Sequence, residues 1–79
     1  MKSIWEFYAF VEELIPDLRE AGESAAADRV DRALRGGATS GEILGDLWIA
    51  MNGLEDGAVD SEGVRNGLAF IRNALGPAR

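Results

Sequence analysis

The chain has 79 residues, of which 14 are acidic and 8 basic, and it contains neither cysteine nor histidine. This composition excludes disulfides and thiolate metal sites, and it removes the usual zinc ligand and the usual general base at neutral pH. The net charge of −6 repels nucleic acid and anionic membrane surfaces, so we expect neither as a partner. Helix packing or self-association must then stabilise a small core.

Apolar runs in the sequence are short. The stretch after Lys2 is interrupted by Glu6 and closed by Glu12 and Glu13, whereas a signal peptide needs a longer uncharged run. No segment approaches the roughly 20 apolar residues of a membrane span. We therefore expect a cytoplasmic protein, with which the absence of cysteine is compatible.

The first predicted helix has about 18 residues and starts at Ser3, which forms a capping box with Glu6. Pro16 predicts a kink or a division of this helix, because its ring removes one backbone hydrogen bond. Gly22 is a natural stop. The apolar face of the helix consists of residues at helical intervals: Ile4, Phe7, Tyr8, Val11, Leu14, Ile15 and Leu18.

The second helix is expected from about Ser24 to Arg35, where small residues leave a thin apolar face. Asp28 precedes Arg32 by four positions, and Asp31 precedes Arg35 by four. This spacing predicts ion pairs along the solvated side of the helix. We therefore favour a self-paired surface over a nucleic-acid site here.

The third helix begins at a second capping box, Thr39 and Glu42, and its apolar stripe extends to Leu54. Gly53 and Gly57 lie where this helix should fray and stop. A loop over residues 55–59 follows, and Asp60 is expected to cap the fourth helix. The fourth stripe and its stop are formed by Val64, Leu68, Ile71, Leu75 and Gly76-Pro77.

Because every connection between these helices is short, sequential helices should pack as antiparallel neighbours. We predict an all-α fold, a small four-helix bundle-like domain that spans residues 1–79 with its first helix kinked near Pro16. No strand alternation and no internal repeat is present.

The sequence contains no pattern typical of catalysis or of ligand binding. The glycine-rich run over 36–41 lacks the preceding strand and the lysine of a phosphate-binding loop. The acidic stretch over 55–62 fails as a calcium loop, because Leu54 and Gly63 occupy two ligand positions. Helix capping accounts for the four serines Ser3, Ser24, Ser40 and Ser61. We predict no enzyme activity, no cofactor and no metal site.

Two features indicate a protein-binding surface. All charged residues between Ala38 and Gly63 are acids, the first helix adds a second acidic block, and from Val64 onward all are arginines. Several apolar residues lie outside the helical stripes, and two glycine pairs, Gly41/Gly45 and Gly63/Gly67, permit close helix approach. The alternatives are solubility for the acids and core packing for the apolar residues. The predicted interface combines both kinds: Trp5, Phe10, Asp46, Trp48, Ile49, Glu55, Asp56 and Phe70.

The leading interpretation is a non-enzymatic protein whose acidic surface binds a basic protein partner. In size, composition and helical class the chain resembles small bacterial immunity proteins and antitoxin-like inhibitors, which implies an inhibitor or immunity-type role. No motif carries a residue role over from these proteins. The alternative is a self-associating, homodimeric helical protein with a structural or regulatory role, whose partner is a second copy.

Overall fold

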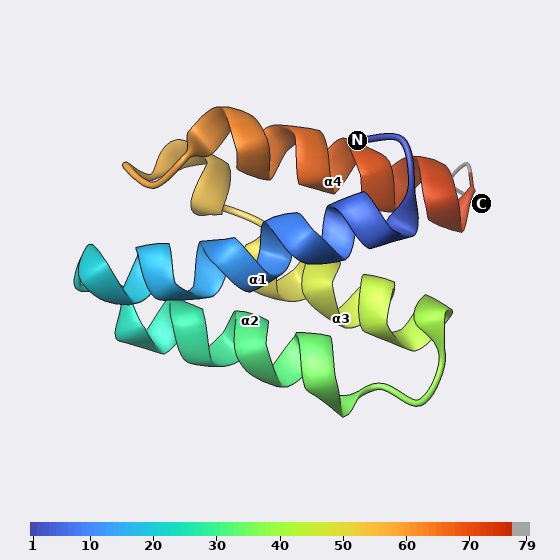
Figure 1. The fold of residues 1–79 in the computed structure, drawn as a ribbon, viewed down its shortest axis with the longest axis horizontal. Helices are drawn as coiled ribbons and strands as arrows, with labels where there is room; N and C mark the ends of the chain where they lie inside the picture. The colour runs from blue at the N-terminus through green and yellow to red at the C-terminus, as the bar shows by residue number, and fades with distance from the viewer. Residues whose placement is uncertain (77–79) are drawn as a thin grey trace.

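The computed structural model describes residues 1–76 of the chain (Figure 1). Within this range the fold is all-α, as predicted, and contains no strand. Four α-helices follow one another, with a short 3-10 helix before the last: α1 (Ile4–Glu20), α2 (Ser24–Gly36), α3 (Ser40–Met51), η1 (Leu54–Asp56) and α4 (Ser61–Leu75).

The helices form a small bundle with extents of 35 × 25 × 22 Å. α2 packs between α1 and α3, and α4 contacts α3, η1 and α1. One end of the bundle gathers the end of α1, the start of α2, η1 and the start of α4, as Figure 1 shows. The opposite end holds the start of the chain and the connection between α2 and α3.

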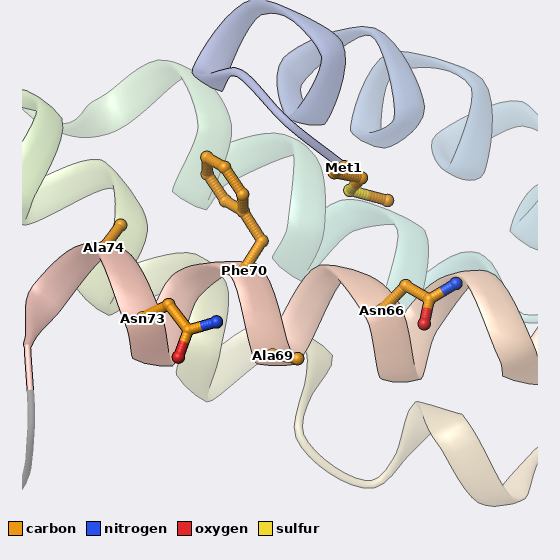
Figure 2. Close-up of a pocket in the computed structure, with 6 residues that line it drawn as sticks. All are labelled: Met1, Asn66, Ala69, Phe70, Asn73 and Ala74. Carbon is orange, nitrogen blue, oxygen red and sulfur yellow. The ribbon is translucent and has the colours of Figure 1, made fainter.

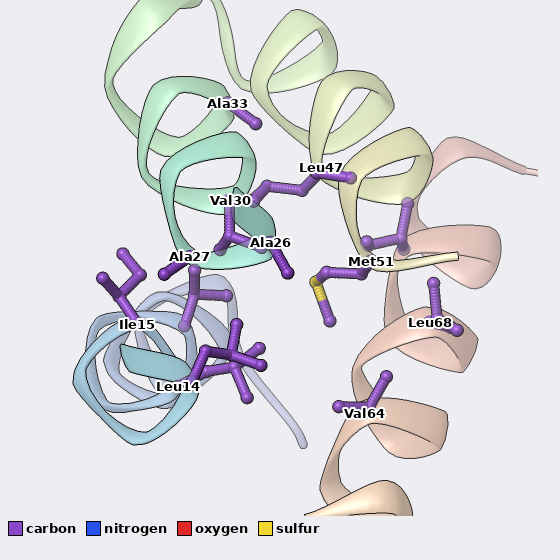
Figure 3. Packing of buried hydrophobic residues seen from close by; sticks show 14 of the residues in the cluster. Leu14, Ile15, Ala26, Ala27, Val30, Ala33, Leu47, Met51, Val64 and Leu68 are labelled. Atoms are coloured by element: carbon purple, nitrogen blue, oxygen red, sulfur yellow. The ribbon is translucent and has the colours of Figure 1, made fainter. Parts of the chain in front are cut away.

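The core contains apolar side chains from all four helices, and none of the described polar or charged residues is buried. Figure 3 shows Leu14 of α1, Val30 of α2 and Met51 of α3 pointing into the common interior. On α2 the buried positions are mostly alanines, so this helix can approach its neighbours closely. The largest fully buried side chains are Phe7, Leu14, Leu18, Leu47, Met51, Ile71, Val11, Val30 and Val64.

α1 begins as expected at Ser3, whose hydroxyl accepts a hydrogen bond of 3.1 Å from the amide of Glu6. The Glu6 carboxylate accepts from the amide of Lys2 at 2.9 Å, one residue before the position that the capping box predicts. The helix is not divided at Pro16, since it continues to Glu20. Pro16 lies on the exposed side, where its ring meets solvent. A kink at Pro16 stays a prediction.

The predicted caps of α3 and α4 are confirmed. The Thr39 hydroxyl accepts from the amide of Glu42 at 3.2 Å, and the Asp60 carboxylate accepts from the amide of Gly63 at 3.1 Å. All four serines lie at or beside helix starts, as predicted, and Ser3 occupies the cap position. The capping role predicted for the other serines is wrong, because each is the first helical residue and follows the residue in the cap position: Ser24, Ser40 and Ser61.

α3 ends at Met51, close to Gly53, where the sequence predicted that the helix begins to fray, although its apolar stripe continues to Leu54. Gly53 adopts a φ of 98°, in the left-handed region, and turns the chain out of the helix. Leu54 packs against the core from η1 instead of from α3. α4 ends at Leu75, and Gly76 follows with a φ of 88°. Pro77, predicted as part of the same stop, lies outside the described residues.

The ion pairs of α2 differ in part from the prediction. Arg35 pairs with Asp31 at 2.7 Å, as expected, and also with Glu12 of α1 at 2.9 Å. Asp28 pairs with Arg19 of α1 at 2.9 Å. The predicted pair of Asp28 with Arg32 is therefore wrong, since packing against α1 offers Asp28 another cation.

Candidate interaction surfaces

Phe10 and Phe70 pack in the seam between α1 and α4, partly buried against the core. The ring of Phe70 stacks on Phe7 with ring centroids 5.1 Å apart. A methyl group added at Gly63 would lie 2.7 Å from the ring of Phe10, and one at Gly67 would lie 3.4 Å from it. This glycine pair therefore admits an aromatic ring of α1 close to the backbone of α4.

A hollow lies beside this seam, between α4 and the start of the chain. Figure 2 shows Phe70 reaching from α4 towards the N-terminal segment that carries Met1. The lining offers amide and apolar side chains but no titratable side chain: Met1, Asn66, Ala69, Phe70, Asn73 and Ala74. Nothing in this lining resembles an acid–base site.

The outer side of α3 presents a second surface. Ile49 projects away from the core with 75% of its area exposed. A methyl group at Gly45 would meet no atom within 4 Å, and one at Gly41 would meet only the hydroxyl of Thr39 at 4.0 Å. Unlike the pair on α4, these glycines are not explained by packing within the fold. We call the outer residues Gly41, Glu42, Gly45, Asp46 and Ile49 the α3 face.

Shallow hollows border the α3 face on both sides. Asp46 and Ile49 line the hollow towards α2, where Arg29 and Arg32 complete it. Trp48, which is half-buried, lines the hollow towards α4. That second hollow is mainly apolar, and its lining consists of Trp48, Ile71, Arg72, Leu75 and Gly76.

Glu55 and Asp56 lie in η1, at one end of the bundle. The Glu55 carboxylate accepts a hydrogen bond of 2.7 Å from the amide of Gly53, so it stabilises the turn after α3. Asp56 is exposed and shares a hollow with Glu23 of the connection between α1 and α2. Apolar side chains line the same hollow: Leu18, Leu54 and Val59.

Acids from distant parts of the chain meet at this end. They come from the last turn of α1, the connection to α2, η1 and the start of α4. The set, which we call the acidic end, is Asp17, Glu20, Glu23, Glu55, Asp56, Asp60 and Glu62. Of the nearby arginines, Arg19 pairs with Asp28, and Arg65 donates to the backbone carbonyl of Glu55 at 3.4 Å. Most carboxylates of the acidic end therefore have no cation beside them among the described residues.

The predicted interface residues are thus divided among four places. Asp46, Trp48 and Ile49 lie on or beside α3, whereas Glu55 and Asp56 belong to the acidic end. Trp5 is 77% exposed on α1, in edge-to-face contact with Tyr8 at a centroid distance of 6.2 Å. Ile49 lies on a different helix, α3, and α2 packs between α1 and α3. The phenylalanines occupy the seam between α1 and α4.

Sequence reasoning did not identify Glu23, Arg29 or Arg32 as members of these surfaces. Glu23 is far in sequence from Asp56, and only the folded chain brings the two to one hollow. The sequence predicted an ion pair between Arg32 and Asp28, but in the structure Asp28 pairs with Arg19 instead. The helical spacing of Arg29 and Arg32 was visible, but their position beside α3 was not.

Two electrostatic features of the described residues concern metal ligation and the ion pairs of Arg35. No cluster of three or more potential metal-ligating residues occurs within residues 1–76. The pKa of Arg35 is raised by its hydrogen bonds to Glu12 and, next, to Asp31. Because a guanidinium is cationic at physiological pH, this shift stabilises an ion-pair cluster without changing its charge. Over the same range, no helix has both the length and the apolar character needed to cross a bilayer.

Comparisons with protein-family models, with curated proteins and with solved structures found no match to this chain. The surfaces are therefore interpreted from their own geometry and charge.

Proposed function

We propose that this protein is a non-enzymatic binding protein whose acidic end recognises a basic segment of a protein partner. The observation that carries the proposal is the meeting of Glu23 and Asp56 at one hollow with an apolar floor. An anionic rim around Leu18, Leu54 and Val59 suits a segment in which lysine or arginine accompanies apolar side chains. The charges steer the encounter, and the apolar floor prolongs the contact.

The residue inventory supports the non-enzymatic part of the proposal. The chain has no cysteine and no histidine, and none of its described acids is buried. The same surface suits an inhibitor or immunity-type role, in which the acidic end would cover a basic region of the target protein. We place this role in the cytoplasm, in keeping with the cysteine-free sequence.

Residue-resolved NMR tests the acidic end directly. The ¹⁵N-labelled protein is titrated with a synthetic peptide that combines lysines with leucines. The same peptide with glutamates in place of the lysines serves as the ligand control. We expect shifts of the amide signals over residues 17–23 and 54–62 with the basic peptide, and none with the acidic one. Shifts spread evenly over all helices would contradict the proposal.

Two double variants with the same change in net charge locate the effect. Glu23→Gln combined with Asp56→Asn removes two charges at the hollow and should weaken peptide binding several-fold. Glu13→Gln combined with Asp46→Asn removes two charges from the middle of α1 and from α3, and it should have little effect. If both double variants weakened peptide binding equally, the acids would contribute only a general charge that keeps the protein soluble.

A second candidate function, a homodimer with a structural or regulatory role, is favoured by a different surface, the α3 face. Ile49 is among the most exposed large apolar side chains of the described chain, and a methyl group added at the nearby Gly45 would meet no atom within 4 Å. This arrangement is typical of a helix that packs against another helix.

A further inference from the structure

We infer that the α3 face is a self-complementary docking surface, on which a second copy of this chain places its own α3 in antiparallel orientation. The inference rests on the second candidate function, the homodimer, and it does not depend on the proposed binding of a basic partner at the acidic end. Its occupant is identified by two properties of the α3 face. One is the fit between a projecting side chain and an unfilled position, and the other is charge complementarity with the neighbouring helix.

The first property is the spacing of Ile49 and Gly45. They lie four residues apart, one helical turn, and therefore follow each other along the same side of α3. Ile49 projects into solvent, whereas the space outside Gly45 is empty. A two-fold axis that runs between the two α3 helices, perpendicular to them and level with the midpoint of Gly45 and Ile49, puts each Ile49 over the partner's Gly45. Both projecting side chains are then buried by one symmetric contact.

The second property is the charge on each side of the contact. Glu42 and Asp46 are acids of the α3 face, and Arg29 and Arg32 lie on the neighbouring α2, where they share a hollow with Asp46. Neither arginine forms an ion pair among the described residues. The antiparallel two-fold arrangement keeps the α2 side of one copy against the α2 side of the other. Asp46 of each copy then faces the partner's Arg32.

The rim towards α4 adds apolar area. Trp48 and Leu75 line the hollow on that side, and Leu75 is 44% exposed. Tryptophan is enriched among the residues that dominate protein interfaces. The α3 face and its two rims thus contain an exposed centre, an aromatic edge and paired opposite charges, the usual components of a specific interface.

Sedimentation equilibrium of the wild type and of two matched variants tests the location of the contact. We expect a concentration-dependent dimer for the wild type, and for Ile49→Asp a dissociation constant at least about tenfold higher. Trp5→Asp is the control, because Trp5 is about as exposed as Ile49 but belongs to α1 instead of α3. It should leave the dissociation constant unchanged. A wild type that stays monomeric at about 1 mM, where even a millimolar dimer is well populated, overturns the inference. Equal effects of the two variants overturn it as well.

Charge reversal tests the pairing across the two copies. Asp46→Arg alone and Arg32→Asp alone each place like charges opposite one another and should weaken the homodimer. An equimolar mixture of the two variants restores both opposite-charge contacts and should form a heterodimer close in affinity to the wild type. Far-ultraviolet circular dichroism confirms that each variant is folded. The inference is overturned if the mixture associates no more tightly than the separate variants. It is also overturned if each variant alone dimerises as tightly as the wild type, because the second copy then does not dock on the α3 face.

Discussion

Tyr8 has a buried hydroxyl with no hydrogen-bond partner among the described residues. An unpaired buried polar group costs about 1–3 kcal/mol. We therefore predict that Tyr8→Phe, which keeps the ring and its contacts with Trp5 and Phe7, raises the free energy of unfolding by up to about 1 kcal/mol. Urea denaturation measures the change. A loss of stability of similar size would show that the hydroxyl is bonded in solution.

The residues whose roles were predictable are those with local partners. Ser3, Thr39 and Asp60 cap their helices by bonds to amides three residues ahead, a distance that the sequence displays directly. Asp28, in contrast, pairs with Arg19 of another helix. Only the folded chain brings this cation within reach of the Asp28 carboxylate. Phe10 likewise lies outside the apolar stripe of α1, and its place is set by Gly63 of α4.

At the scale of the helix, the two glycine pairs should respond oppositely to alanine. Gly63→Ala adds a methyl group 2.7 Å from both the Phe10 ring and the carboxyl carbon of Asp60, the residue that caps α4. We expect a loss of about 1 kcal/mol or more, from the disturbed cap and from overpacking.

Gly45→Ala meets no atom within 4 Å and should stabilise the monomer by up to about 1 kcal/mol through helix propensity. Thermal unfolding at low protein concentration compares the two variants. In sedimentation equilibrium, the same Gly45→Ala change should weaken the dimer, because the methyl group occupies the position proposed for the partner's Ile49. Stabilisation of both the monomer and the dimer would argue against this contact.

The existence and order of the helices were predictable because each amphipathic stripe is flanked by its own start and stop signals. Their ends were less so. Leu54 continues the apolar period of α3, but Gly53 lies in the left-handed region and breaks the helix before it. The helical spacing of the apolar residues predicted that Leu54 faces the core. It did not predict that Leu54 reaches the core from η1, after the turn at Gly53. α1 continues beyond Pro16 to Glu20, and the proline ring lies on the exposed side of the helix.

Across the whole molecule, charge is distributed unevenly along the bundle. The acidic end gathers carboxylates from α1, η1 and α4 that repel one another in the folded state. We predict that raising the salt concentration from about 0.01 M to about 0.15 M increases the melting temperature, because the Debye length falls from about 30 Å to about 8 Å. Differential scanning calorimetry measures this change. A fall in melting temperature would show that the ion pairs of Arg19 and Arg35 outweigh the repulsion at the acidic end.

The clustering of these acids illustrates what the sequence could not reveal. Acidic blocks were visible in the first helix and over residues 42–62. Their separation into an acidic end and an α3 face depends on how the helices pack, which places Asp56 beside Glu23 and Asp46 beside Arg32. The predicted interface therefore grouped Asp46 with Asp56, although the structure assigns them to different surfaces.

The central claim is that this small bundle carries two separate binding surfaces, and amide chemical shifts followed under two perturbations test it most directly. On dilution, signals over residues 41–49 should move as the two copies separate, while those of residues 54–62 stay in place. On addition of the lysine- and leucine-containing peptide to the dilute protein, the signals over residues 17–23 and 54–62 should move instead. If a single set of residues responds to both perturbations, or if neither perturbation moves a localised set, the two-surface account is wrong.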